Sequence, residues 1–216
     1  MILEDIMKQD IVTLSPNNTI EDAITLLTLH KIRHIPIVDD NKKILGIISD
    51  RDIRDASPSI LIHNEQSDYL KTQLTKIMTR NVITGSPLDF VEEAAAIFYE
   101  YKISCLPVER QGKLIGIVTE TDLLHTLVQL TGAHQPSSHI EVKVPNRTGM
   151  LAEVVNIIKK RNVNITSILV YPDKDENYKI LVFRVQTMNP TGLIADLKAS
   201  GKIIKFPDIP GATHEL

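Results

Sequence analysis

The sequence predicts a mixed α/β (α+β) protein, in which two copies of a β-α-β-β-α repeat precede a different unit of the order β-α-β-β-α-β. Three observations support this prediction. A set of residues recurs at constant spacing in the first part of the chain. Apolar residues recur at helical or strand spacing within every predicted unit. A short segment of linker composition separates the repeats from the last part of the chain.

The internal repeat is long enough to define a structural module. Six residues, Met7, Thr13, Pro16, Ala23, Ile32 and Pro36, return 71 positions later as Met78, Thr84, Pro87, Ala94, Ile103 and Pro107. Gly46 and Asp52 return as Gly116 and Asp122, 70 positions later, so one residue was lost in the turn between. We therefore place repeat 1 at about 5–55 and repeat 2 at about 76–127, within a first domain of residues 1–130.

The sequence pattern predicts the same elements in the same order in both repeats. After a short first strand, a helix follows with its apolar residues at i, i+3, i+4 and i+7, namely Ile20, Ala23, Ile24 and Leu27, and again Val91, Ala94, Ala95 and Phe98. Two apolar strands come next, at 35–38 and 44–48, then at 106–108 and 114–118. A second helix closes each repeat, from about Asp50 and Glu120. A further helix is expected at 68–77, before repeat 2.

The rest of the chain has a different pattern. Residues 131–138 have linker composition, and residues 139–216 form the last predicted domain. Ile140, Val142 and Val144 alternate with polar residues as in a half-buried strand. A turn at 145–149, a helix from Leu151, strands at 165–171 and 178–185, a helix at 191–199 and a strand at 202–206 complete the ferredoxin-like order.

The repeated segments 46–52 and 116–122 carry the chemistry. In each, an apolar strand ends in a hydroxyl residue, Ser49 or Thr119, and an aspartate, Asp52 or Asp122, lies three positions later. A hydroxyl beside free N–H groups suits a phosphate, and a carboxylate suits sugar hydroxyls. Either pair alone is also typical of a helix cap. Repetition favours a pair of nucleotide sites, and the two roles are compatible.

Residues 5–55 and 76–127 resemble two CBS motifs, the tandem pair that forms a Bateman module, through 35–38 with Gly46, Ser49 and Asp52 and through 106–108 with Gly116, Thr119 and Asp122. Residues 144–151 and 162–165 resemble an ACT domain, a ferredoxin-like sensing module. The ACT turn usually reads Asp-Arg-Pro-Gly, and this chain departs from it at Asn146 and Thr148. The order of the domains resembles the AcuB-type acetoin-utilisation accessory proteins of bacteria.

The CBS resemblance implies an adenine-nucleotide ligand and its site. The aspartates would bind the ribose hydroxyls, and Ser49 and Thr119 the phosphate. The full nucleotide-binding set comprises Ile11, Thr13, Arg33, His34, Ile35, Pro36, Ser49, Arg51, Asp52, Val82, Thr84, Cys105, Leu106, Pro107, Thr119 and Asp122. Repeat 1 carries Arg33, His34 and Arg51 where repeat 2 carries Ser104, Cys105 and Thr121, so we expect the Asp52 site to bind a charged nucleotide more tightly. Otherwise these arginines are solvated surface charges.

The ACT resemblance implies a second ligand, an amino acid or small metabolite, at Asn146, Arg147, Thr148, Gly149, Met150 and Leu151. Helix N–H groups suit a carboxylate. Asn146 in place of aspartate removes a charge that could hold an ammonium group. The domain therefore either binds such a ligand or serves only to form a homodimer.

Composition excludes several other classes. The chain has 216 residues, 43% hydrophobic and 24% charged, with a net charge of −3, which is ordinary for a globular protein and does not favour nucleic acid. No membrane-length apolar run and no signal-peptide pattern is present, which predicts a cytoplasmic protein. Cys105 is the single cysteine and the seven histidines are scattered, so we expect no metal site.

Taken together, the sequence predicts a non-enzymatic regulatory sensor that needs no cofactor. Its CBS pair would bind AMP, ADP, ATP or a related adenosyl ligand and regulate an unidentified protein partner, in acetoin or acetate catabolism by resemblance. One alternative is a dimerising structural adaptor with vestigial pockets. The other is a phosphoryl-transfer enzyme, for which the repeats supply no visible Mg²⁺ ligands.

Overall fold

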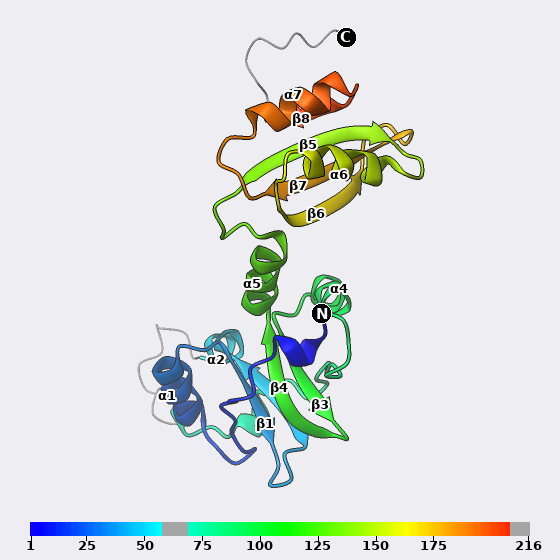
Figure 1. The fold of residues 1–216 in the computed structure, drawn as a ribbon. Helices are drawn as coiled ribbons and strands as arrows, with labels where there is room; N and C mark the ends of the chain where they lie inside the picture. The colour runs from blue at the N-terminus through cyan, green and yellow to red at the C-terminus, as the bar shows by residue number, and fades with distance from the viewer. Residues whose placement is uncertain (58–68, 208–216) are drawn as a thin grey trace. The chain divides into compact units, whose positions relative to one another are not determined.

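The computed structural model describes residues 1–57 and 69–207 (Figure 1). The chain divides into two compact units, Met1–Leu124 and His125–Leu216. The division falls inside helix α5 (Glu120–Thr131), which begins in the first unit and ends in the second. None of the helices in the described ranges combines the length and the apolar character that crossing a membrane requires.

The first unit contains two similar sets of elements. Repeat 1 consists of α1 (Ile20–His30), β1 (His34–Val38), β2 (Ile44–Ser49) and α2 (Asp50–Ala56), and β1 pairs with β2 in antiparallel fashion. Repeat 2 consists of α4 (Val91–Tyr101), β3 (Cys105–Arg110), β4 (Lys113–Thr119) and the start of α5, with β3 and β4 paired in the same way. These elements confirm the predicted order of helix, two strands and helix in both repeats.

The first strand predicted in each repeat is shorter than expected. It consists of one parallel bridge, between Leu14 and Ile37 in repeat 1 and between Gly85 and Val108 in repeat 2. The hydrogen bonds are nevertheless well formed, since the N–H of Leu14 donates to Pro36 O at 3.1 Å and that of Gly85 to Pro107 O at 2.9 Å. The bridges attach the lead-in segments to β1 and β3.

The helix predicted at 68–77 is wrong over most of that range, of which residue 68 lies outside the described residues. Tyr69 and Leu70 are helical, but the chain turns at Lys71 and then forms a 3₁₀ turn, η2 (Leu74–Lys76). The N–H of Leu74 donates to Asn18 O, and the N–H of Ile20 donates to Thr72 O. These long-range backbone bonds hold the segment against the start of α1, which a continuous helix could not satisfy.

Each repeat receives the segment that leads into the other repeat. Leu3, in η1 (Leu3–Asp5), is fully buried in the core of repeat 2, and Leu74 is fully buried in the core of repeat 1. Neither core is complete with the residues of its own repeat. The two repeats therefore form one folded module, because each supplies apolar side chains that the other needs.

The exchange explains why a glycine and a methionine recur in the sequence. A Cβ atom on Gly46 would lie 2.6 Å from Met78 Sδ, and one on Gly116 would be closer still to Met7 Sδ. The methionine of each lead-in segment thus lies directly on the glycine of the opposite repeat. The recurring spacing reflects a backbone approach that a larger side chain would obstruct.

The second unit has the predicted ferredoxin-like order. It contains β5 (Ser138–Pro145), α6 (Met150–Lys160), β6 (Ile165–Pro172), β7 (Tyr178–Val185), α7 (Thr191–Ala199) and β8 (Ile203–Phe206), and the antiparallel sheet has the order β6-β7-β5-β8 (Figure 1). Both helices pack against one face of the sheet. Their shared core contains Ile140, Val142, Val144, Met150, Val154, Ile158, Leu181, Phe183, Val185, Leu193, Ile194, Leu197 and Ile204.

Candidate functional site

Among the described residues of the first unit, two cavities each combine residues of both repeats. The first, which we call the Asp52 cavity, is lined by Arg33, His34, Ile47, Ser49, Asp50, Arg51, Asp52, Arg54, Thr79, Lys102, Ile103, Ser104 and Cys105. The second, which we call the Thr119 cavity, is lined by Lys8, Asp10, Ile11, Val12, Lys31, Ile32, Arg33, His34, Ile117, Thr119 and Thr121. The hydroxyl motif of one repeat thus faces the lead-in or strand segment of the other.

Ser49 and Asp52 form a reciprocal cap where β2 meets α2. The backbone N–H and the hydroxyl of Ser49 each donate to Asp52 Oδ2 at 2.7 Å, and the N–H of Asp52 donates back to Ser49 Oγ at 3.2 Å. The capping interpretation of this pair is therefore confirmed. In the described part of the chain, Asp52 Oδ1 receives no hydrogen bond or ion pair, and Asp52 lines its cavity.

Thr119 and Asp122 repeat this geometry with one difference. The N–H of Thr119 donates to Asp122 Oδ2 at 2.9 Å and its hydroxyl at 2.6 Å, while Lys8 Nζ lies 2.9 Å from Asp122 Oδ1. Burial tends to raise the pKa of Asp122, but the hydrogen bonds from Thr119 and Lys8 outweigh it and lower that pKa below its ordinary value. Asp122 is thus an ionised carboxylate with both oxygens engaged.

Arg33 and His34 line both cavities, which places them at the boundary between the two sites. His34 Nε2 lies 3.0 Å from Ser104 Oγ of repeat 2. Burial, followed by the positive charge of Arg33, lowers the pKa of His34 below its ordinary value despite the nearby carboxylates. The imidazole is therefore neutral at pH 7. Two arginines were expected to favour nucleotide binding at the Asp52 site. Arg51 lines the Asp52 cavity, whereas Arg33 lines both cavities.

Cys105 occupies the position in repeat 2 that His34 has in repeat 1. Its side chain is 5% exposed, and burial, together with the charge of Asp122, raises the pKa of the thiol to about 12. A thiol in this state has no nucleophilic character at neutral pH. Cys105 therefore acts as a small buried side chain that lines the Asp52 cavity.

The structure brings together only some of the predicted nucleotide-binding residues. Ile11, Arg33, His34, Ser49, Arg51, Asp52, Cys105 and Thr119 line the cavities. Ile35, Pro36, Leu106 and Pro107 are buried in the strands, where they support the cavity walls. Thr13, Val82 and Thr84 belong to the lead-in segments outside the lining of either cavity. Asp122 is also absent from both linings, and its carboxylate pairs with Lys8.

The sequence analysis missed two residues at equivalent positions that line the cavities. Lys8 lines the Thr119 cavity and Thr79 lines the Asp52 cavity. Each directly succeeds a methionine of the repeat, Met7 or Met78, so they occupy equivalent positions. The register of the repeat could have identified them as the first difference between the sites.

The turn predicted to bind a ligand in the second unit has a defined backbone. Gly149 adopts a φ of +91°, a left-handed conformation that favours glycine, immediately before α6. Met150 is buried in the core, whereas Arg147 and Thr148 are exposed. The N–H of Asn146 donates to Asn177 O at 2.7 Å. Two surface cavities of this unit are lined by other residues.

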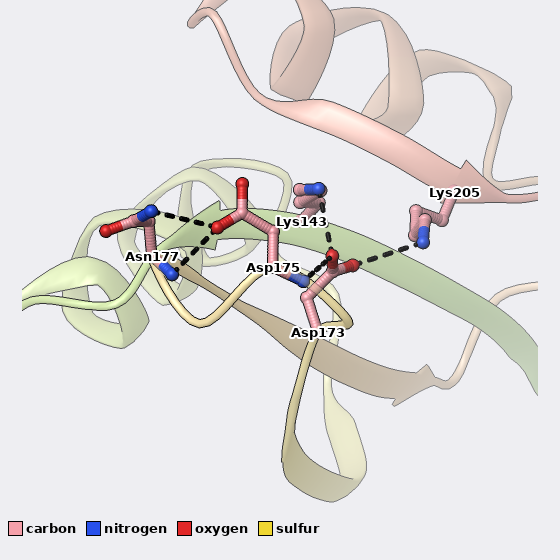
Figure 2. Close-up of polar contacts among 5 residues, drawn as sticks. All are labelled: Lys143, Asp173, Asp175, Asn177 and Lys205. Carbon is pink, nitrogen blue, oxygen red and sulfur yellow. Dashed lines mark hydrogen bonds and ion pairs between the residues drawn. The ribbon is translucent and has the colours of Figure 1, made fainter.

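A polar cluster that the sequence did not indicate lies at the β6–β7 turn (Figure 2). Asp173, whose side chain is 6% exposed, accepts hydrogen bonds from Lys143 Nζ at 3.0 Å, Lys205 Nζ at 3.2 Å and the Asp175 N–H at 3.1 Å. The Asp175 N–H and then Lys143 lower the pKa of Asp173 well below its ordinary value. Its bonds are satisfied within the unit, so the cluster fixes the turn to β5 and β8.

Within the described ranges, no group of three or more histidine, cysteine, aspartate or glutamate side chains is arranged to hold a metal ion. The chemistry available in the first unit is therefore that of hydroxyls, carboxylates and basic side chains around two cavities. That combination suits a ligand with a sugar and an anionic group.

Comparison with known proteins identifies the class to which this arrangement belongs. A model of the CBS domain matches residues 3–59 and 74–129, and a model of the ACT domain matches residues 138–201. The chain belongs to the CBS-domain family, as a tandem CBS pair followed by a C-terminal ACT domain. Both resemblances expected from the sequence are confirmed.

Curated relatives match mainly the CBS pair. A CBS domain-containing protein of Dictyostelium discoideum is 30% identical over 143 residues, which are 64% of this chain and 99% of that protein. A homoserine O-acetyltransferase of Methanococcus vannielii is 36% identical over 127 residues, 58% of this chain. The match spans 25% of that enzyme, so the likeness concerns a module and not the whole enzyme.

Solved structures resemble the first part of the chain. A protein assigned to acetoin utilisation (AcuB) from Vibrio cholerae is 34% identical, with a TM-score of 0.55, covering 64% of this chain and 98% of that one. The CBS pair of protein MJ0100, in complex with 5′-methylthioadenosine and S-adenosyl-L-methionine, is 32% identical, with a TM-score of 0.52 and coverage of 62% and 98%. CBSX2 in complex with AMP is 27% identical, with a TM-score of 0.52 and coverage of 59% and 96%.

Proposed function

We propose that this protein is a non-catalytic sensor whose CBS pair binds an adenine nucleotide or a related adenosyl ligand in the Asp52 and Thr119 cavities. The observation that carries the proposal is the construction of both cavities from the two repeats together. A ligand bound between two repeats can change how they pack, and it does so by the difference in its affinity for the two packings.

The chemistry of the cavities supports specific roles for their residues. Asp52 Oδ1 is available to accept hydrogen bonds from ribose hydroxyls, and Arg51 and Arg33 offer charge-assisted bonds to a phosphate. We assign Asp122 the ribose role in the second cavity, with Ser49 and Thr119 near the phosphate. The adenine would pack on the strand segments at Cys105 and at Ile11. The adenosyl ligands of MJ0100 and CBSX2 support this ligand class.

The role of the ACT domain forms a separate part of the proposal. The edge strand β6 exposes Leu169 and Val170, with 47% and 53% of their surfaces accessible. Exposed apolar side chains along an edge strand favour pairing with another chain, which supports a homodimer. We further propose that the turn 146–151 binds an amino acid or small metabolite, or serves assembly alone, and that the protein regulates a partner in acetoin or acetate catabolism, as the AcuB likeness suggests.

Thermal unfolding with a ligand panel tests the sensor proposal. AMP, ADP, ATP, 5′-methylthioadenosine and S-adenosyl-L-methionine are added in turn, and free ligand at 100 times Kd should raise the free energy of unfolding by about 2.7 kcal/mol. The double variant D52A/D122A should lose the shift. D22A is the matched control, because Asp22 caps α1 in the same way as Asp52 caps α2, yet lines neither cavity.

Each outcome of the panel decides between the candidate functions. Stabilisation by a ligand in the wild type and in D22A, but not in the double variant, supports the sensor. Absence of any shift favours the structural adaptor with vestigial pockets. Conversion of ATP to products during incubation, measured by chromatography, would overturn the non-catalytic assignment.

A further inference from the structure

Lys8 and Thr79 mark the point at which the two cavities differ most directly. The backbone of Lys8 exchanges hydrogen bonds with Ile117 at 2.9 and 3.0 Å, and that of Thr79 exchanges them with Ile47 at 2.9 Å in both directions. The backbone therefore holds both residues at the same place on the equivalent strands, β4 and β2, which lead to Asp122 and Asp52. Only the side chain differs, an ammonium in one repeat and a hydroxyl in the other.

The lysine changes what a ligand meets in the Thr119 cavity. Lys8 Nζ lies 2.9 Å from Asp122 Oδ1, the Asp122 side chain is 14% exposed, and Lys8 lines the cavity where Asp52 itself lines the other. The sugar of a ligand can bind Asp52 without breaking a contact. To bind Asp122, it must first displace the ammonium of Lys8 from a largely buried carboxylate.

A phosphate can replace Asp122 as the anionic partner of Lys8. The Lys8 side chain is 59% exposed, so water can solvate a displaced ammonium, but Lys31 and Arg33 also line the Thr119 cavity and repel it. A nucleoside offers no anion. A nucleotide offers its phosphate, which can accept a charge-assisted bond from Lys8 while the ribose takes its place on Asp122.

Basic residues also surround the Asp52 cavity, but they act differently. Arg51 and Arg54 line it, and Arg54 Nη2 lies 3.3 Å from Asp50 Oδ2. In the described residues none of these arginines contacts the Asp52 carboxylate. A phosphate would therefore add affinity in this cavity, although a ligand without one can bind without breaking an ion pair.

We propose that Lys8 makes the Thr119 cavity selective for phosphate-bearing adenine nucleotides, whereas the Asp52 cavity also accepts adenosyl ligands that have no phosphate. The inference rests on the proposed function, since it assigns a ligand class to each of the two sites. It makes Lys8 a specificity-determining residue and predicts that the sites can hold different ligands at the same time.

Isothermal titration of the full chain with AMP and with adenosine tests the inference in single-cavity variants. In D52A, which leaves the Thr119 cavity, AMP should bind and adenosine should bind about ten- to a hundredfold more weakly. In D122A, which leaves the Asp52 cavity, the ratio between the two ligands should be smaller. Adding K8T to D52A should recover adenosine binding, whereas K8R should retain the selectivity of D52A.

The reciprocal substitution, Thr79→Lys, tests whether a lysine at this position confers the selectivity in the other cavity as well. Adding T79K to D122A should weaken adenosine binding in the Asp52 cavity and leave AMP binding in place. An AMP-to-adenosine ratio that is the same in D52A and D122A, and unchanged by K8T and T79K, would overturn the role of Lys8 while leaving the sensor function intact. Absence of binding by AMP, ADP, ATP, 5′-methylthioadenosine and S-adenosyl-L-methionine to the wild-type chain would instead refute the proposed function itself.

Discussion

Repeat 1 and repeat 2 share a backbone but present different side chains to their cavities. The residues that set the backbone are the same in both, as in the approach of Met78 to Gly46 and of Met7 to Gly116. The residues that face the cavities have diverged, with His34 opposite Cys105 in register and Lys8 opposite Thr79. The two repeats therefore keep the same backbone packing, but their two cavities present chemically different side chains.

The largest effect is expected where the repeats depend on each other. Leu3→Ala and Leu74→Ala each remove a fully buried side chain from the core of the opposite repeat, and each should cost about 2–5 kcal/mol of unfolding free energy. Urea unfolding measures this loss, with the exposed Leu88→Ala as a control that should change little. A negligible loss in L3A beside a large one in L74A would contradict the symmetric exchange.

A smaller effect is expected at the boundary of the two sites. His34→Ala should weaken AMP binding in both D52A and D122A, by about three- to tenfold, because His34 lines both cavities and contacts Ser104. Titration calorimetry in the two single-cavity variants measures it. His30→Ala, an exposed histidine at the end of α1, is the control. Weakening in one variant alone would show that His34 belongs to a single site.

The same histidine predicts a dependence of stability on pH. Burial and Arg33 lower the folded-state pKa of His34, so its contribution to stability is complete above the unfolded pKa of about 6.5 and is lost as the pH falls from there through the folded pKa. Asp50, Asp52 and Glu120 oppose the shift. His34→Gln should flatten the stability profile of urea unfolding between about pH 7.5 and 5.5. An unchanged slope would contradict this origin.

The smallest effect concerns the counterpart in repeat 2. Cys105 is 5% exposed with a thiol pKa of about 12, so native protein should react with iodoacetamide very slowly at neutral pH, and should react readily after unfolding in urea. Mass spectrometry of the alkylated protein measures the rate. Rapid labelling of the folded chain would show that this wall of the Asp52 cavity opens in solution.

The sequence was sufficient to predict the fold because its signals were local and repeated. The helical faces from Ile20 and Val91 and the alternation from Ile140 each specify an element without tertiary information. The segment 71–77 was predicted wrongly because its backbone is bonded to Asn18 and Ile20, far away in sequence. The local spacing of apolar residues cannot predict such long-range hydrogen bonds.

The site was less predictable than the fold, for the same reason. Ser49 and Asp52 are close in sequence, so their pairing could be anticipated. The combination of Thr119 with Ile11, and of Ser49 with Cys105, depends on how the repeats pack. The ion pair between Lys8 and Asp122 joins residues 114 positions apart, and no motif contains both.

A crystal structure of the protein grown with AMP tests the central account most directly. The account predicts AMP in the Asp52 cavity, with its ribose hydroxyls within hydrogen-bond distance of Asp52 Oδ1 and its adenine against the segment of Cys105 in the other repeat. AMP bound elsewhere on the chain, or an Asp52 carboxylate that does not contact the sugar, would contradict it.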